Sequence, residues 1–305
     1  MPQHRRRVPV SLSVLAAASL AAAAPAVAQQ DGREAPWTLA VSHAAGSAAD
    51  LDGGGEVDVD RSALTLGWRT RTAGGTGLRL DLRYEQEDWH FSGASALGGA
   101  GWGDVRRARI GFSIQRPLGA NWHWAVSPML QYAGERGAET SDALIYGAAL
   151  AFNRSFAADK MLGIGLVALH DIDETRLRPY LAVSWALGER WRIGNAAATG
   201  PAGPAGLELA FRADQRWDFG LGAGMREQRF RLDEDGPNAG GVGESRSLPV
   251  YARASLTAGP RLRLDAFAGT ALRNRLRLEP GAGGERRSED YDDSPVFGLG
   301  LSVGL

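Results

Sequence analysis

The 305-residue chain contains no cysteine, so disulfide bonds, thiolate metal sites and cysteine nucleophiles are excluded. After its first 28 residues it has no apolar run of 18 residues, which excludes a further transmembrane helix. A basic surplus is also missing, because the formal net charge is −1. Nucleic acid is therefore not an expected partner.

The first residues have the three parts of an export signal. Arg5, Arg6 and Arg7 form a positive start, the stretch 8–24 is apolar, and residues 26–28 (Ala-Val-Ala) give a small–x–small cleavage pattern. The sequence predicts a signal peptide over 1–28 and one mature domain over 29–305. An uncleaved N-terminal anchor is the alternative. Cleavage would remove three arginines and no acidic residue, which changes the net charge from −1 to −4.

The rest of the chain is rich in apolar residues without being hydrophobic overall. Hydrophobic residues make up 44% of the chain, yet the mean hydropathy is −0.22. A membrane barrel has this balance, because every second residue of a strand faces lipid and the others face the interior. The 41 glycines suit tight turns and small strand positions.

Apolar and polar residues alternate with a period of two in many segments. The clearest are 78–85, 108–114, 207–212 and 261–265. On a helix these residues would spread charge over every face, whereas on a strand they separate onto two sides. A soluble sandwich fits any one such strand, but the export signal, the number of segments and the alternating loop lengths together favour a barrel in the outer membrane.

The segments predict an antiparallel up-and-down barrel of about 14 strands, with 12 as the alternative because the region around Trp191 is weak. The expected strands are 37–46, 57–72, 76–92, 103–117, 121–134, 142–156, 160–177, 179–187, 190–197, 205–214, 216–232, 245–258, 261–279 and 294–305. Tryptophans near strand ends indicate membrane interfaces. They are Trp37, Trp68, Trp122, Trp124, Trp185, Trp191 and Trp217.

Several motifs carry a family resemblance. They are Arg106–Gly111, Trp124–Pro128, Asn195, Gly200–Leu209 and Gly243–Pro249. With them the chain resembles an uncharacterised outer-membrane β-barrel family of Gram-negative bacteria, a domain of unknown function. The resemblance spans roughly the mature chain and implies fold and location only, with no catalytic residue.

The last strand alternates to the final residue. Phe297, Leu299, Leu301 and Val303 share one face with Leu305, and glycine or serine occupies the other. This resembles the terminal signal read by the barrel-assembly machinery, which is the partner expected during biogenesis. The usual final residue is aromatic, and Leu305 departs from that pattern.

Charged residues on the polar face of the strands predict the lining of the lumen, because each would cost about 2–4 kcal/mol at the bilayer midplane. The predicted lining residues are Arg79, Asp81, Arg83, Glu85, Arg107, Arg109, Glu208, Arg212, Asp218, Arg253, Arg263 and Asp265, together with Arg226, Arg273 and Arg275. Arginine outnumbers acid, so an open lumen would mildly favour anions. The leading hypothesis is a channel or transport barrel for small solutes. The alternative is a structural or surface-interaction barrel whose lumen is sealed by Arg–carboxylate pairs.

A lipid-modifying enzyme is a distant third hypothesis. His90, with Ser92 two residues later, is the best candidate for a catalytic pair, but there is no Gly-x-Ser-x-Gly elbow. Two acidic runs, 233–235 and 289–293, invite a calcium site but lack the spacing of a calcium loop. No enzyme activity, cofactor or metal is expected. The expected partners are outer-membrane lipid and lipopolysaccharide. In a looser role, divalent cations would bridge the acidic runs to lipopolysaccharide phosphates, which would also recruit Arg286 and Arg287.

Overall fold

The computed structural model describes residues 36–93, 95, 97, 101–196, 200–202, 206–281 and 284–305. The predicted signal peptide lies outside these ranges. Within them, no helix is long and apolar enough to cross a membrane.

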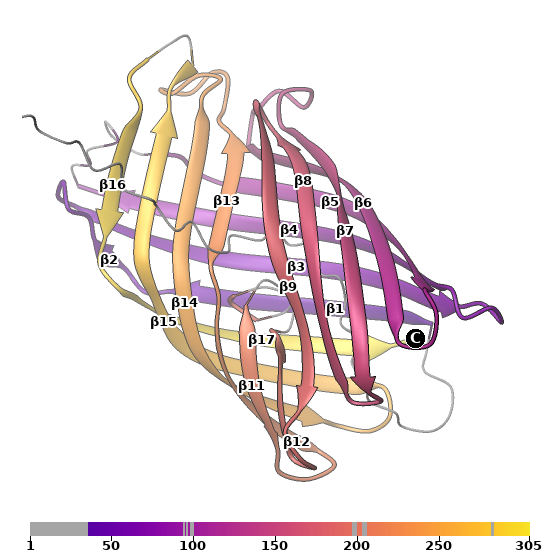
Figure 1. The fold of residues 1–305 in the computed structure, drawn as a ribbon. Helices are drawn as coiled ribbons and strands as arrows, with labels where there is room; N and C mark the ends of the chain where they lie inside the picture. The colour runs from indigo at the N-terminus through magenta and orange to yellow at the C-terminus, as the bar shows by residue number, and fades with distance from the viewer. Residues whose placement is uncertain are drawn as a thin grey trace, which may run out of the picture.

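Strands make up most of the described chain (Figure 1). They are β1 (Trp37–Gly46), β2 (Ala49–Asp50), β3 (Glu56–Arg71), β4 (Gly77–Ser92), β5 (Val105–Pro117), β6 (Trp122–Glu135), β7 (Leu144–Ala157), β8 (Lys160–Asp171), β9 (Glu174–Ala186), β10 (Trp191–Asn195), β11 (Leu207–Arg212), β12 (Trp217–Ala223), β13 (Arg226–Arg231), β14 (Val242–Thr257), β15 (Leu262–Glu279), β16 (Arg287–Tyr291) and β17 (Ser294–Gly304).

The sheet closes on itself because β1 pairs antiparallel with both β3 and β17. The short β2 pairs with β3 and β16 pairs with β15, while β12 and β13 are successive segments beside β14. The result is a closed antiparallel barrel of 14 strands, which confirms the first count. The 12-strand alternative fails because β10 and β11, on either side of the weak region, are both paired strands.

One predicted boundary is wrong. The sequence predicts a break near residue 178, but the chain turns at Ile172 and Asp173, and Asp171 pairs with Glu174. Ile172 has a positive φ of 65°, which the local sequence does not indicate. Since the alternation runs on through Arg176 and Arg178, it hides the fact that a turn precedes them.

The outer face of the wall is apolar. One row of paired residues, Leu82, Ile110 and Leu130, is 39–47% exposed on neighbouring strands. Tryptophans stand where strands meet short turns: Trp37 pairs with Trp68 at a ring distance of 6.3 Å, and Trp191 lies 4.8 Å from the ring of Phe211. In such barrels the short turns face the periplasm and the long connections face the exterior. The end with the short turns is therefore the periplasmic end, and the opposite end is the extracellular end.

Candidate functional site in the barrel interior

Two strands of the wall stop half-way up. The strands β10 and β11 have five and six residues. On its β9 side, β10 pairs with three residues alone, Ser184, Trp185 and Ala186. The side chain of Asn195 then takes the place of the missing strand: its Oδ1 accepts a hydrogen bond from the Val183 amide at 2.8 Å, and its Nδ2 donates to the Leu181 carbonyl at 3.1 Å. The extracellular half of β9 therefore has no backbone partner on this side among the described residues.

Described residues between these two strands pack against the inner side of the wall. Ala196 and Ala202 are buried against Tyr251 and Phe267, which point inward from β14 and β15. Gly206 packs so closely on Gly224 that a Cβ on Gly224 would lie 2.4 Å from the Gly206 Cα. This close approach marks the point where β12 ends and the chain bends into β13.

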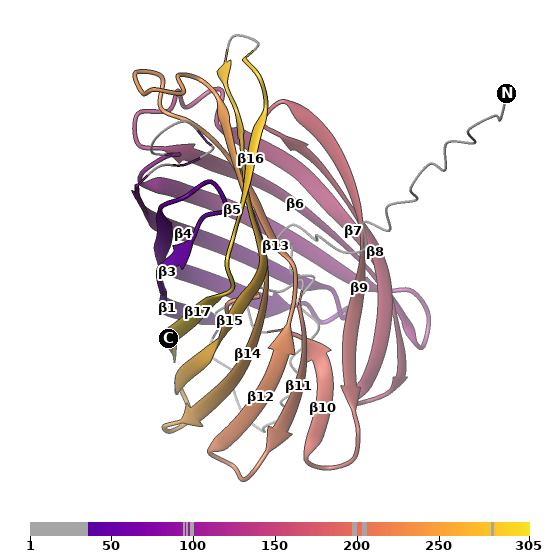
Figure 2. The same ribbon diagram turned by 90° about the vertical axis from the view of Figure 1, so that its left-hand side faces the viewer.

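Beyond the bend, β13 forms a hairpin with the first part of β14, which is itself paired with β15 in the wall. We call β13, residues 232–241 and residues 242–247 of β14 the inner hairpin. Residues of β12 alternate between exposed and buried, whereas every residue of β13 is at least half-buried. The tip reaches across to β6, where Arg231 pairs with Gly134. In Figures 1 and 2, β13 stands beside β14 and apart from the β9 strand along most of its length.

Ion pairs hold the inward face of the hairpin to β4. Arg226 donates to Glu85 at 2.7 Å and to Glu87 at 2.9 Å, and Gln228 donates to Glu85 at 3.2 Å. Both carboxylates are buried and meet four guanidinium groups in all. These belong to Arg61, Arg83, Arg107 and Arg226. The cluster has an excess of two positive charges.

The other face of the hairpin lies against β9. Glu227 accepts from Arg176 at 2.7 Å and from Arg178 at 2.5 Å, and both arginines are on β9. Arg229, whose side chain is 1% exposed, donates to Asp173 at 2.7 Å in the turn before β9. Side-chain ion pairs, and not a hydrogen-bonded ladder, therefore close the wall between β9 and β13.

Apolar side chains fill the extracellular half of the interior. Phe230 is fully buried, with its ring 5.1 Å from that of Trp102. Leu276 and Leu278 point to the same cluster from β15, and Val167 points to it from β8. The buried inward-facing side chains of β7 and β8 at this height include Ile145, Val167 and Leu169, so this part of the interior is apolar.

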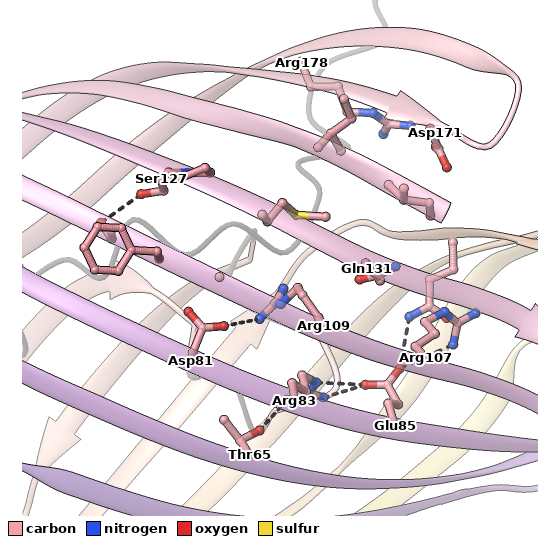
Figure 3. Close-up of a pocket in the computed structure, with 18 of the residues that line it drawn as sticks. Thr65, Asp81, Arg83, Glu85, Arg107, Arg109, Ser127, Gln131, Asp171 and Arg178 are labelled. Carbon is pink, nitrogen blue, oxygen red and sulfur yellow. Dashed lines mark hydrogen bonds and ion pairs between the residues drawn. The ribbon is translucent and has the colours of Figure 1, made fainter. Parts of the chain in front are cut away.

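Below this cluster lies a polar cavity of about 140 Å³ (Figure 3). Seven of the residues predicted to line the lumen surround it, namely Arg79, Asp81, Arg83, Glu85, Arg107, Arg109 and Arg226. Arg109 pairs with Asp81 at 3.3 Å, and Arg83 pairs with Glu85 at 2.6 Å. Asp171 and Arg178 reach it from the other side (Figure 3). Seven arginines and four acidic residues line the cavity, an excess of three positive charges.

The predicted residues on the later strands form a second cluster near the periplasmic end. Arg253 pairs with Glu208 at 2.5 Å and with Asp218 at 2.7 Å. Asp265 accepts from Arg263 at 3.0 Å, and Ser255 bridges it to Arg253. Arg212, the last residue of β11, is exposed and joins no ion pair among the described residues.

Arg273 and Arg275 are predicted to line the lumen, and the structure corrects this. On β14, Arg246 pairs with Arg275 and Leu248 with Leu272, so two residues of β15 oppose the single Ser247. This bulge reverses which side chains of β15 face inward. Both arginines are consequently exposed on the outer side.

The candidate catalytic pair is not formed. His90 contacts Asp58 at 3.1 Å, and no contact joins it to Ser92. The sequence does not single out another pair on the outer face, His43 and Ser62, which are 3.0 Å apart. Both are exposed, and no carboxylate of the described chain orients His43. In the described ranges, no three or more acidic or histidine residues gather in a group that could hold a metal ion.

An apolar outer belt, aromatic strand ends and a sheet that closes on itself through β1 and β17 decide the location. The protein is an outer-membrane β-barrel. No protein-family model and no curated protein matches the sequence.

Several solved structures have a similar overall shape. An outer-membrane channel of the COG4313 group from Pseudomonas putida F1 is 10% identical with a TM-score of 0.46, over 90% of this chain and 98% of that one. A FadL homologue from Pseudomonas aeruginosa is 12% identical with a TM-score of 0.45, over 88% and 90%. The NanC porin is 8% identical with a TM-score of 0.40, over 88% and 100%. Similarity at this level carries no conclusion about function.

Proposed function

We propose that the protein is a transport barrel for small solutes and that this structure is its closed conformation. The observation that carries the proposal is the polar cavity inside the wall, which is lined by eleven charged residues. A barrel that needs only to be stable gains little from buried charges, because their desolvation offsets most of their attraction. A water-filled path for polar solutes does require them.

Anions are the solutes that the cavity favours. Its lining has three more arginines than acidic residues. Arg79 has no ion-pair partner in the described chain, so its charge is available to a solute. A lumen with fixed positive charge attracts anions and repels cations.

The inner hairpin is the element that closes the path. It lies across the extracellular half, held by side chains to β4 on one face and to β9 on the other. On its β9 side it could move without breaking a backbone ladder. The bend at Gly224, between β12 and β13, is where such a movement would begin.

A barrel with a permanently sealed lumen is the second candidate. The apolar cluster around Phe230 favours it, because this cluster resembles a protein core and leaves no polar route through the extracellular half. In that case the extracellular connections would carry the function.

Recordings from the purified protein in planar lipid bilayers separate the two candidates. A transport barrel with a closed resting conformation should show brief openings, and under a salt gradient their reversal potential should indicate anion preference. A folded protein that passes no current under any applied voltage would favour the sealed barrel.

A further inference from the structure

The outer wall carries a groove where the apolar belt ends at the extracellular side. Its volume is about 760 Å³, and the bend before β13, β14, β15 and the β16–β17 region contribute to it. The lining includes Met225, Arg246, Arg273 and Arg275. The residues next below on the same face are apolar: Leu248 is paired with Leu272, and Val250 is 43% exposed. The arginines therefore lie at the height of the lipid headgroups of the outer leaflet.

Arg273 and Arg275 reach this face only because of the bulge opposite Ser247. Arg273 has a φ of 52°, and it is one of two residues other than glycine with a positive φ in the described chain. Glycine or asparagine adopts this conformation more readily than arginine does. Strained backbone of this kind often marks a functional position.

The guanidinium group of Arg273 is not committed to the protein, and that of Arg246 is committed only in part, because Arg246 is the cross-strand partner of Glu227. Arg275 binds Asp290 through two hydrogen bonds, of 2.5 and 2.7 Å. Arg273, by contrast, has no salt-bridge partner among the described residues, and the contact found for Arg246 is to the sulfur of Met225 at 3.3 Å. Guanidinium groups recognise phosphate through paired hydrogen bonds.

We propose that Arg246, Arg273 and Arg275 form a binding site for the phosphate groups of an outer-leaflet glycolipid. Asp292 and Asp293 also line the groove, so a free anion would meet no net positive charge there. A phosphorylated lipid has a second source of affinity, because its acyl chains lie on the apolar belt directly below the arginines. This site is independent of transport, since it is on the outside of the wall.

The test measures binding of lipid A to the delipidated barrel in detergent, with bisphosphorylated lipid A, its dephosphorylated form and inorganic phosphate as the probes. The variant combines Arg246→Ala with Arg273→Asn, and asparagine keeps the positive φ accessible. Arg286→Ala is the matched control, because Arg286 is an exposed arginine at the same end that lies outside the groove and pairs with Glu279.

Wild type and the Arg286→Ala control should bind bisphosphorylated lipid A equally. The double variant should bind it about 100-fold more weakly, roughly tenfold for each guanidinium group removed from the phosphates. Dephosphorylated lipid A should bind wild type as weakly as the double variant binds the phosphorylated form. If the double variant is misfolded, Arg273→Gly alone should show the tenfold weakening, because glycine suits the backbone there. Equal binding by the folded variant, no preference for the phosphorylated lipid, or equally tight binding of inorganic phosphate would overturn the proposal.

Discussion

Replacing Glu227 by glutamine should open the barrel. The Glu227 carboxylate, 12% exposed, joins the inner hairpin to Arg176 and Arg178 on β9. Removing one partner of a buried ion pair costs about 3–5 kcal/mol, because the remaining charge is left without compensation. Arg176 keeps its ion pairs with Asp171 and Glu174, so we expect the lower end of this range, about 3 kcal/mol. Water would hydrate the arginines once the hairpin moves, so the cost falls on the closed conformation.

A difference of about 3 kcal/mol corresponds to roughly a 100-fold rise in the ratio of open to closed barrels. Single-channel recording measures this ratio directly as the open probability. Asp290→Asn is the control, since it removes an exposed ion pair outside the wall and should leave the open probability unchanged. If Glu227→Gln inserts and folds normally but opens no more often than wild type, the hairpin is not the closing element. Adding Arg178→Gln to Glu227→Gln should restore part of the closed population.

Four further predictions test other parts of the structure. Arg79→Glu should shift the reversal potential toward cations with folding intact, and an unchanged potential would exclude the cavity from the conduction path. It is a cleaner change than reversing Arg107, which is 7% exposed and would place a third carboxylate beside Glu85 and Glu87. Phe112→Arg puts a charge on the lipid face at a cost of about 2–4 kcal/mol and should impair insertion, whereas Asp81→Asn on the inner face should be tolerated; equal tolerance would contradict the assigned faces. Gly243→Ala would place a Cβ 2.4 Å from the Phe230 ring, so its thermal unfolding temperature should fall by several degrees, and no change would mean that the ring is loosely held. The mature protein in outer-membrane fractions should begin at Gln29 by N-terminal sequencing, and a retained 1–28 segment would contradict the export signal.

The strand pattern is largely predictable because each lipid-facing strand shows its period directly in the sequence. Fourteen strands, the apolar outer belt and the short periplasmic turns all follow from it. The turn at Ile172 is not predictable in this way, because the alternation of Arg176 and Leu177 gives no sign of where the preceding strand stops. The bulge at Arg273 is equally hidden, since one extra residue changes the face without changing the composition.

The inner hairpin does have a signal in the sequence. From Arg226 to Arg231 charged or polar residues occupy both faces of the strand, interrupted only by Phe230. No lipid-facing strand tolerates that arrangement, so the segment has to be covered on both sides. Its partners cannot be deduced from the sequence, because they depend on β10 and β11 being too short to complete the wall.

The side-chain seam between β9 and β13 also bears on the size of the barrel. A barrel whose strands are all joined by backbone hydrogen bonds has a diameter set by its strand number and stagger. At the periplasmic end, backbone hydrogen bonds through β10 and β11 join the strands of this barrel. Towards the exterior its two margins, β9 and β13, are joined by side chains, among them Arg176, Arg178 and Glu227. The diameter of the extracellular half can therefore change while the diameter at the periplasmic end stays constant.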